Sequence, residues 1–170
     1  MQRPYKYCPW CASKLGQRDV DGRHRLSCLD PECGYVVWEN PIPVVAAIVE
    51  HEGRIILAHN RTWPDGVYSV ITGFLEKTEA PERGVLREVE EELGLLGEVI
   101  DFIGVYAFPT MNQLILAYYV KATGNLVLNQ ELTRIKRIEK SKLKGWSFGT
   151  GLAVSDWVAK YGKIPSRETP

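Results

Sequence analysis

All four cysteines of the chain lie before residue 34, in two close pairs, Cys8 with Cys11 and Cys28 with Cys33. A short turn between two cysteines can present both thiolates to one ion, and four thiolates complete the tetrahedral site that Zn²⁺ prefers. Because such a site has no open coordination position, we expect a structural and not a catalytic zinc ion. A segment this short buries too little surface to fold alone, so the metal would supply the missing free energy.

Two other interpretations of this segment stay open. The cysteines could be unrelated buried or free thiols, although their occurrence in two close pairs argues against that. A zinc ribbon can also bind nucleic acid or protein, but a solvated loop explains equally well the only residues that support it: Arg18, Arg23, His24 and Arg25.

A second group of chemically active residues is acidic. Glu88, Glu91 and Glu92 occupy positions i, i+3 and i+4, which share one face of a helix. An apolar face lies next to them, because hydrophobic residues recur at helical spacing at Val85, Leu86, Val89 and Leu93. Three carboxylates within one turn repel one another. A bound Mg²⁺ or Mn²⁺ ion would remove the conflict, since carboxylate oxygens are hard ligands. On the helix alone, a solvated acidic face explains the pattern equally well.

The stretch from Gly73 to Leu95 resembles the Nudix box, Gly-x5-Glu-x7-Arg-Glu-U-x-Glu-Glu-x-Gly-U with U aliphatic, at every position. The resemblance implies an α+β fold, an α/β/α sandwich on a mixed sheet, in which the box forms a loop, a helix and a loop. It extends more loosely over residues 41–165. The fold class expected for the whole chain is this sandwich preceded by a small zinc ribbon.

The resemblance also implies roles for individual residues. Glu88, Glu91 and Glu92 would be metal ligands, joined by the backbone carbonyl of Thr72. Arg87 and Glu79 would pair to hold the loop against the helix, and Gly73 would permit a tight turn before it. Members of the family usually need one further carboxylate as a ligand or general base. Glu131 lies where such a residue commonly occurs, and its alternative interpretation is an exposed loop residue.

The implied activity is hydrolysis of the pyrophosphate bond in a nucleoside diphosphate linked to another group. Divalent cations would separate the acidic site from the negatively charged substrate and lower the pKa of a bound water. The products would be a nucleoside monophosphate and the phosphorylated remainder. The partner would therefore be a small nucleotide, and the resembling family admits a homodimer.

A zinc ribbon followed by this box is similar to the NADH pyrophosphatases. Those enzymes carry Ser-Gln-Pro-Trp-Pro-Phe-Pro-x-Ser after the box, of which only Phe108-Pro109 survives here, with Tyr106 in the place of the Trp. The segment from Phe108 to Gln113 also resembles the Leu-Pro-x-x-Ser-Gln of proteins related to FAD and ADP-ribose pyrophosphatases. FAD, NAD(H) and ADP-ribose are all candidate substrates, and the departure from the NADH motif favours FAD or ADP-ribose.

Substrate contacts are predicted at aromatic and basic positions around the box. Tyr106, Phe108 and Trp63 could stack on a base or flavin ring, or could be ordinary core residues. Arg61 could contact a phosphate, or could form a surface ion pair.

A locally basic run follows at Arg134, Lys136, Arg137, Lys140, Lys142 and Lys144. Its alternating spacing favours a solvated edge strand over a contact to an RNA 5′ end. A competing hypothesis for the whole chain is a nucleotide-sensing module, or one that binds or decaps RNA 5′ ends, on the same fold. An intact box favours catalysis.

The elements that must position these residues follow from hydrophobic periodicity. Strands are predicted at 44–49 and 55–58 around a turn at 51–53, then at 67–71, 100–108 and 114–120. A helix is predicted at 81–93, where Pro81 suits the first turn and Gly94 the C-terminus. A second helix is predicted from about residue 152 to residue 161, stopped by Gly162. Prolines 41 and 43 suggest an extended connection, which divides the chain into a zinc ribbon at 1–40 and a hydrolase domain at 41–170.

The bulk composition excludes several classes of partner. The formal net charge is zero, so no overall field attracts nucleic acid or an anionic membrane. No run approaches the roughly 18 apolar residues of a membrane span. The N-terminus has no apolar stretch of the kind found in signal peptides, so we expect a cytoplasmic protein without a membrane partner.

Overall fold

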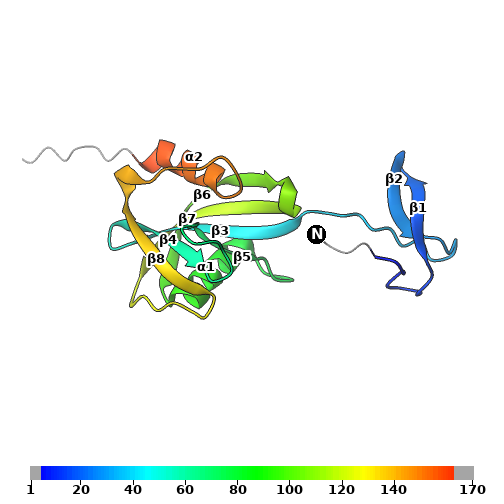
Figure 1. Ribbon diagram of the computed structural model, residues 1–170, viewed down its shortest axis with the longest axis horizontal. Helices are drawn as coiled ribbons and strands as arrows, with labels where there is room; N and C mark the ends of the chain where they lie inside the picture. The colour runs from blue at the N-terminus through cyan, green and yellow to red at the C-terminus, as the bar shows by residue number, and fades with distance from the viewer. Residues whose placement is uncertain (1–4, 163–170) are drawn as a thin grey trace, which may run out of the picture. The chain divides into compact units, whose positions relative to one another are not determined.

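The computed structural model describes residues 5–162. Its contacts group the chain into two compact units, Met1–Asn40 and Pro41–Pro170 (Figure 1). Within the described residues, no helix is long and apolar enough to cross a membrane.

The first unit is built on one antiparallel hairpin, β1 (Leu15–Val20) and β2 (Arg23–Cys28). Asp21 and Gly22 connect the strands, and both have positive φ angles, as a two-residue hairpin turn requires. The first cysteine pair precedes β1, whereas Cys28 ends β2 and Cys33 follows it. The hairpin therefore brings together two cysteine pairs that are distant in sequence.

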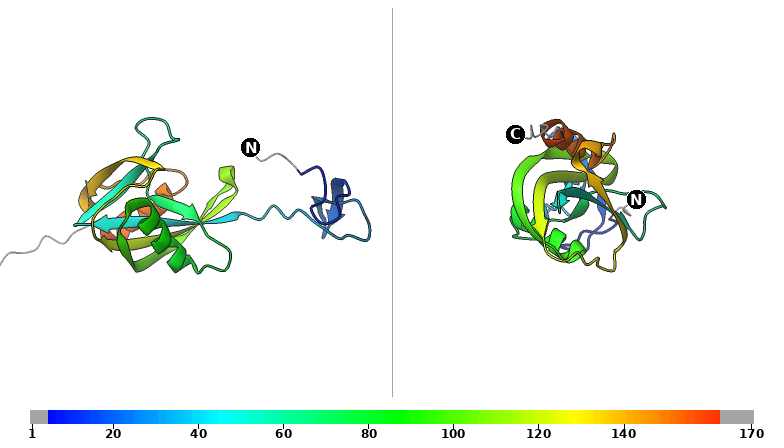
Figure 2. Two further views of the ribbon diagram at one scale, coloured as in Figure 1. Left: turned by 90° about the horizontal axis from the view of Figure 1, so that it is seen from below. Right: turned by 90° about the vertical axis from the view of Figure 1, so that its left-hand side faces the viewer.

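The second unit contains a six-stranded mixed sheet with the order β6-β7-β3-β4-β8, in which β5 pairs with β3. Only β3 and β7 run parallel, and every other pair is antiparallel. The strands are β3 (Ile42–His51), β4 (Arg54–Asn60), β5 (Ile71–Phe74), β6 (Leu96–Phe108), β7 (Gln113–Thr123) and β8 (Leu132–Glu139). Two register shifts in β6 accompany the strong curvature of β6 and β7 (Figure 2, right).

Both faces of this sheet are covered. Alternate residues of β3 enter two different core clusters, Val45, Ala47 and Val49 on one face and Val44, Ala46 and Ile48 on the other. A strand buried on both faces is apolar throughout, which explains the unbroken hydrophobic run. Helix α1 (Pro81–Leu93) contributes to the first cluster and α2 (Gly151–Tyr161) to the second, so the helices lie on opposite sides of the sheet (Figure 1). The predicted α/β/α sandwich is confirmed.

Helix α1 has the predicted bounds, and α2 begins one residue earlier than predicted. Gly94 adopts the left-handed conformation that ends α1, with φ of 65°. Seen from below, α1 lies across the sheet, with one side of the helix against the strands and the other facing away from them (Figure 2, left). Short 3₁₀ turns, η1 (Pro109–Met111) and η2 (Lys140–Lys142), complete the elements.

The strand predicted at 67–71 is wrong. The observed strand, β5, begins at Ile71, because its pairing with β3 runs from Ala47↔Ile71 to Val44↔Phe74. Before it, Ser69 makes only an isolated bridge to Ala58. Strand β6 also begins earlier than the predicted residue 100. Glycine and acidic residues at its start dilute the hydrophobic pattern, although Leu96 already pairs with Thr123 of β7.

Candidate functional site

The four cysteine thiols lie close together. The Sγ atoms of Cys8 and Cys33 are 3.6 Å apart and those of Cys11 and Cys28 are 3.4 Å apart. All four lie within 4.8 Å of one another, and no other group of ligand-type residues in the described part of the chain is as tight. Four sulfurs around a tetrahedral zinc ion would be about 3.8 Å apart, as follows from a Zn–S distance of about 2.3 Å. The donor set therefore fits one tetrahedral ion.

Hydrogen bonds already favour a thiolate within this cluster. Contacts with the side chain and backbone of Ser13 lower the pKa of the Cys11 thiol to about 6. Burial raises the pKa of Cys28, which is almost completely covered. The cysteines are all free thiols and form no disulfide.

The second unit contains a cavity of about 980 Å³. Val44 of β3 and Ile115 of β7, which are register partners, line it from the sheet. Helix α1, strand β5, and the segments that precede β5, β8 and α2 supply the other walls. The cavity therefore lies where β5 leaves the sheet edge and where elements from both helical layers meet.

Helix α1 places its glutamates in this cavity. Glu88, Glu91 and Glu92 all line it, and Glu131 reaches it from the segment between β7 and β8. The Glu92 residue is only 8% exposed, and burial, followed by the charges of Glu88, Glu131 and Glu91, raises its pKa to about 8. Burial also raises the pKa of Glu88, although the neighbouring Arg87 opposes that effect. This side of the cavity is therefore short of positive charge.

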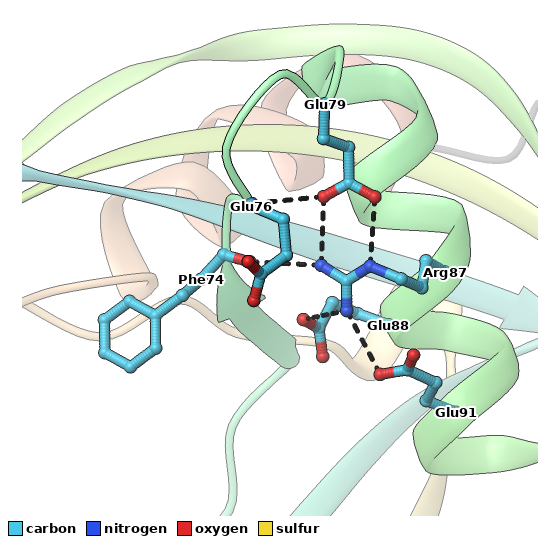
Figure 3. A network of polar contacts seen from close by, with 6 residues as sticks. All are labelled: Phe74, Glu76, Glu79, Arg87, Glu88 and Glu91. Atoms are coloured by element: carbon cyan, nitrogen blue, oxygen red, sulfur yellow. Dashed lines mark hydrogen bonds and ion pairs between the residues drawn. The ribbon is translucent and has the colours of Figure 1, made fainter.

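Arg87 holds the loop that precedes α1 (Figure 3). Its Nε and Nη2 atoms each donate to one oxygen of Glu79 at 3.0 Å, and Nη2 also donates to the carbonyl of Phe74 at 3.1 Å. Glu79 in turn accepts a hydrogen bond from the backbone N–H of Glu76 at 3.2 Å. The structure thus brings Arg87 and Glu79 into a bidentate pair, the geometry in which a guanidinium binds a carboxylate most specifically.

The remaining donor of Arg87 turns toward the acidic cluster. Nη1 contacts Glu88 Oε1 at 2.7 Å and Glu91 Oε2 at 3.1 Å (Figure 3). The carboxylates of the acidic cluster are not as tightly gathered as the cysteines, because Glu88 and Glu91 lean toward this guanidinium. No hydrogen bond lowers the pKa of Glu92, and the charges that shift it are those of Glu88, Glu131 and Glu91.

Gly73 does not form the tight turn that was predicted for it. It lies within β5, opposite Val45, and its φ angle is not positive. A Cβ atom at this position would overlap the carboxylate of Glu88. Glycine is needed here because the Glu88 side chain passes directly over the backbone. Thr72, the residue before it, lines the cavity as a metal-ligating carbonyl would require.

The sequence did not single out Gly84, although it is buried in the first turns of α1. A Cβ atom there would lie 2.9 Å from both Glu79 Oε2 and Leu75 Cδ1. Its absence lets the loop pack tightly enough for Glu79 to meet Arg87. The only sequence signal was a glycine inside an otherwise regular helix, which often marks a close approach.

Arg61 forms no ion pair with an acidic side chain in the described part of the chain, and its contacts are with backbone carbonyls. Its Nε donates to the carbonyl of Gln130 at 2.9 Å, and its backbone N–H donates to the carbonyl of Glu131 at 2.7 Å. It does not line the cavity. The surface ion pair is not seen among the described residues, and the phosphate contact stays a prediction; the observed contacts of Arg61 fix the segment that carries Glu131. Asn129 ties the same segment to α1, because its backbone N–H donates to the Glu92 carbonyl at 3.2 Å.

The predicted aromatic contacts divide into two groups. Phe108 and Trp63 line the cavity, whereas Tyr106 does not. The Tyr106 hydroxyl donates to Asp156 Oδ2 of α2 at 2.7 Å, and its ring packs against the core cluster beneath that helix. This packing agrees with the alternative interpretation of Tyr106 as an ordinary core residue, on the same face of β6 as Phe108.

Four aromatic residues of the cavity wall were missed by sequence reasoning: Tyr68, Phe74, Trp146 and Phe148. Trp146 and Phe148 belong to the segment before α2, in which Gly145, Gly149 and Gly151 alternate with them. Two aromatic residues among glycines, outside any strand or helix pattern, were the available signal.

The first half of the basic run, Arg134, Lys136 and Arg137, lies on β8, which is the edge strand that its alternating spacing predicted. Lys140 and Lys142 lie on η2, and Lys144 follows that turn. The charges of the run are mostly neutralised. Arg134 pairs with Asp65, Arg137 with Glu52, Lys140 with Glu50 and Lys142 with Glu139, while Lys136 lies 3.9 Å from the centre of the Tyr68 ring. These pairings agree with a solvated edge strand.

Known proteins resemble this chain in both sequence and fold. A family model described as "NUDIX domain" matches residues 40–147. The chain is 27% identical over 129 residues to an NAD-capped RNA hydrolase of Pseudomonas aeruginosa, covering 76% of this chain and 45% of that protein. It is 33% identical over 122 residues to one of Vibrio parahaemolyticus, covering 70% of this chain and 45% of that protein. The chain thus spans about half the length of these curated relatives.

Solved structures share the fold at lower identity. A NUDIX hydrolase from Nitrosomonas europaea superposes with a TM-score of 0.78 at 21% identity, over 92% of both chains. An ADP-ribose pyrophosphatase from Streptococcus suis superposes with a TM-score of 0.57 at 18% identity, over 74% of this chain and 97% of that one. The family model covers more than half of the sequence and includes the whole of the acidic loop and helix, so this protein belongs to the Nudix family.

Proposed function

We propose that the protein hydrolyses the pyrophosphate bond of a nucleoside diphosphate linked to another group and releases a nucleoside monophosphate. The observation that carries the proposal is the convergence of Glu88, Glu91, Glu92 and Glu131 on one cavity that also has aromatic walls. An acidic wall cannot approach a pyrophosphate without cations between them, whereas an aromatic wall suits a planar base.

The acidic residues fit a divalent cation. Glu92 is a buried carboxylate whose pKa is raised by burial and by the charges of Glu88, Glu131 and Glu91, and a cation is the partner that such a group lacks. Glu88, Glu91, Glu92 and Glu131, with the Thr72 carbonyl, would hold Mg²⁺ or Mn²⁺, which prefer hard oxygen ligands. Bound cations neutralise phosphoryl oxygens and lower the pKa of a coordinated water.

The chain's own residues would prepare this site. Arg87 and Glu79 fix the loop that carries β5 into α1, and Gly73 leaves room for the Glu88 carboxylate. Arg61 and Asn129 hold the segment of Glu131 beside the end of α1. These contacts keep the carboxylates in place before substrate arrives, so that little reorganisation is needed during the reaction.

The cysteine cluster would hold one Zn²⁺ ion with a structural role, within a ribbon formed by residues 1–40. Residues 41–170 would form the hydrolase domain. The support is the close spacing of the four sulfurs, all within 4.8 Å of one another, and the separate grouping of contacts in the two units.

The candidate substrates are NAD(H), FAD and ADP-ribose. The curated relatives are described as NAD-capped RNA hydrolases, which favours the NAD pyrophosphate, either free or at an RNA 5′ end. A panel of these compounds with Mg²⁺ or Mn²⁺ tests the proposal through the monophosphate that appears. Hydrolysis of none of them with either ion would contradict it.

A capped RNA is the second candidate substrate, because the relatives are described as NAD-capped RNA hydrolases. The RNA body would need a surface that contacts phosphates, and the ion pairs of Arg134 and Arg137 on β8 and of Lys140 on η2 leave this region little free charge. Comparison of NAD with an NAD-capped oligonucleotide, at several salt concentrations, separates the two. A preference for the capped RNA that weakens with salt would identify contacts to the RNA body.

A further inference from the structure

The cavity has two chemically different sides. Three of its glutamates, Glu88, Glu91 and Glu92, belong to α1, which packs on one face of the sheet. Val44, Ile115, Phe108 and Trp146 also line it, and all four belong to the core cluster on the opposite face or pack against that cluster. The cavity therefore extends around the sheet edge from an acidic side to an aromatic side.

The aromatic side offers no positive charge to a ligand. Among the described residues, Arg87 is the only lysine or arginine that lines the cavity, and Glu79, Glu88 and Glu91 occupy its guanidinium. A phosphate has no ionic partner on this side. The part of a ligand that enters it must bind through stacking and neutral hydrogen bonds, and Gln113, the cross-strand partner of Phe108, supplies an amide that can donate and accept.

The wall formed by the segment before α2 is fixed in place. Gly149 has a φ of 53°, and a Cβ atom there would lie 3.4 Å from the Phe108 ring, so this backbone packs on Phe108. The hydroxyls of Ser69 and Thr150 are 2.9 Å apart, which joins the segment to the one that precedes β5. An aromatic wall held in this way loses little conformational freedom when a ring stacks on it.

Phe148 is the exposed member of this wall. It is 63% exposed although it is a large apolar side chain, and it lines the cavity beside the half-buried Trp146. Leaving such a ring in water is unfavourable, and covering it with a planar ligand recovers that free energy.

We propose that Phe148 and Trp146 bind the planar heteroaromatic base of the nucleotide, beside Phe108, and determine which bases the enzyme accepts. The inference rests on the proposed function, because it assigns the aromatic side of the same cavity to one half of the substrate. The acidic side and its cations then receive the pyrophosphate.

Binding of half-substrates tests the assignment. AMP and nicotinamide mononucleotide contain a base, whereas ribose 5-phosphate contains the same sugar and phosphate without one. With Mg²⁺ present, Phe148→Ala should weaken binding of AMP or nicotinamide mononucleotide about tenfold, because a stacked aromatic residue commonly contributes a factor of this size. It should leave the affinity for ribose 5-phosphate unchanged, and Phe148→Tyr should restore the base-dependent affinity. Phe102→Ala removes an exposed phenyl outside the cavity and is the matched control.

The same variants distinguish this inference from the proposed function. In the active enzyme, Phe148→Ala should raise the KM for a base-bearing substrate about tenfold and leave kcat within about twofold, because it acts on binding away from the reacting bond. Hydrolysis by wild type together with unchanged KM and affinities in Phe148→Ala would overturn the inference alone. Base-dependent binding without hydrolysis of any substrate would overturn the proposed function alone.

Tryptophan fluorescence gives a readout that does not depend on activity. AMP or nicotinamide mononucleotide should quench the emission, and Trp146→Phe should remove most of that quenching, because the phenyl ring keeps the stack but not the fluorophore. Trp38→Phe, in the first unit, should retain it. Equal quenching by ribose 5-phosphate, or no quenching by either nucleotide, would contradict a base held by Trp146.

Discussion

Arg87 forms ion pairs with Glu79, Glu88 and Glu91, and one guanidinium cannot neutralise three carboxylates. Two of its nitrogen atoms donate to Glu79, and the third donates to Glu88 and Glu91. Glu92 receives no hydrogen bond from Arg87 that would lower its pKa. The acidic cluster is therefore only partly neutralised by protein groups. At the scale of single residues, this imbalance is the strongest physical support for divalent cations.

Glu92→Gln should reduce kcat by at least about 100-fold, because even residues that merely support a metal ligand commonly contribute 10- to 100-fold. The fold should be retained, since the apolar face of α1, with Val85, Val89 and Leu93, is unchanged. Steady-state kinetics and circular dichroism measure the two effects. Wild-type turnover in this variant would remove the carboxylate from the mechanism.

Thermal unfolding with Mn²⁺ or Mg²⁺ extends this test. An ion that binds only the folded state raises Tm, so wild type should gain stability with the metal and Glu92→Gln should gain less. Glu90→Gln, on the same helix but exposed and outside the cavity, is the control and should respond like wild type.

Gly73→Ala should lower kcat about tenfold or more, because the added methyl overlaps the Glu88 carboxylate and displaces a group that a metal site needs in place. Gly104→Ala introduces the same methyl into β6, where the neighbour is the end of the Tyr106 side chain. Measuring kcat for both variants tests whether the loss is specific to Gly73. Equal losses would indicate a general effect of strand glycines.

At the scale of elements, an ion pair joins the sheet to the segment that leads toward α2. Glu50 of β3 accepts hydrogen bonds from Lys140 of η2, at 2.6 Å, and from Tyr119 of β7. Burial by itself raises the pKa of Glu50, but these two donors outweigh burial and lower the pKa below its ordinary value. The pair therefore stabilises the fold only while Glu50 is ionised.

Glu50→Gln should lower the free energy of unfolding at pH 7 by about 1 kcal/mol, as expected for a charge-assisted hydrogen bond that becomes neutral. The contribution of a carboxyl group whose pKa is lowered on folding is complete above its unfolded pKa and is lost as pH falls through the lower folded value. The difference from wild type should therefore shrink below the ordinary Glu value of 4.5. Denaturant unfolding at pH 7 and at about pH 3.5 measures it.

The control for this pair is Glu98→Gln, an exposed glutamate of β6, which should change stability little at either pH. A stability loss in Glu50→Gln that is as large at pH 3.5 as at pH 7 would mean that shape, and not charge, matters at this position.

The helix that carries the glutamates was predictable to the residue, whereas the strand before it was not. Pro81 and Gly94 mark the ends of α1 chemically, and its apolar face has the helical period. Strand β5 has no such marks. Its bounds depend on where it meets β3, a contact between residues that are about 25 positions apart in the sequence, so residues 67–71 could only be placed by their own propensity.

At the scale of the whole molecule, the chain consists of two units with separate internal contacts. The first has one short hairpin and few buried apolar side chains, among which Cys8 and Cys28 are prominent. A unit with so small a core would depend on a bound metal for stability. The second has cores on both faces of its sheet and needs no such ion to fold.

Elemental analysis should find one zinc per chain, and Cys28→Ser or a strong chelator should unfold residues 5–40 while the sheet of the second unit persists. Hydrogen exchange resolved along the chain measures both responses. Ser27→Ala is the control and should keep its zinc, because the Ser27 hydroxyl has no hydrogen-bond partner among the described residues. Absence of zinc from the native protein would discard the ribbon.

The sequence by itself determined the features that depend on local spacing. Two cysteine pairs and three glutamates on one helical face can each be read from residues a few positions apart, whereas the pairing of Arg87 with Glu79 was implied by the resemblance to the Nudix box. The sequence also indicated both helices and most strands, because burial imposes a period that each segment displays.

Only the tertiary structure decided which residues from different elements share the cavity. In the structure Tyr106 contacts Asp156 of α2, Arg61 contacts the segment that carries Glu131, and Phe148 and Trp146 line the same cavity as the glutamates. It also showed that Gly73 is required by a side chain that lies fifteen residues further along the chain. Such contacts depend on packing between distant segments, and no local pattern in the chain encodes them.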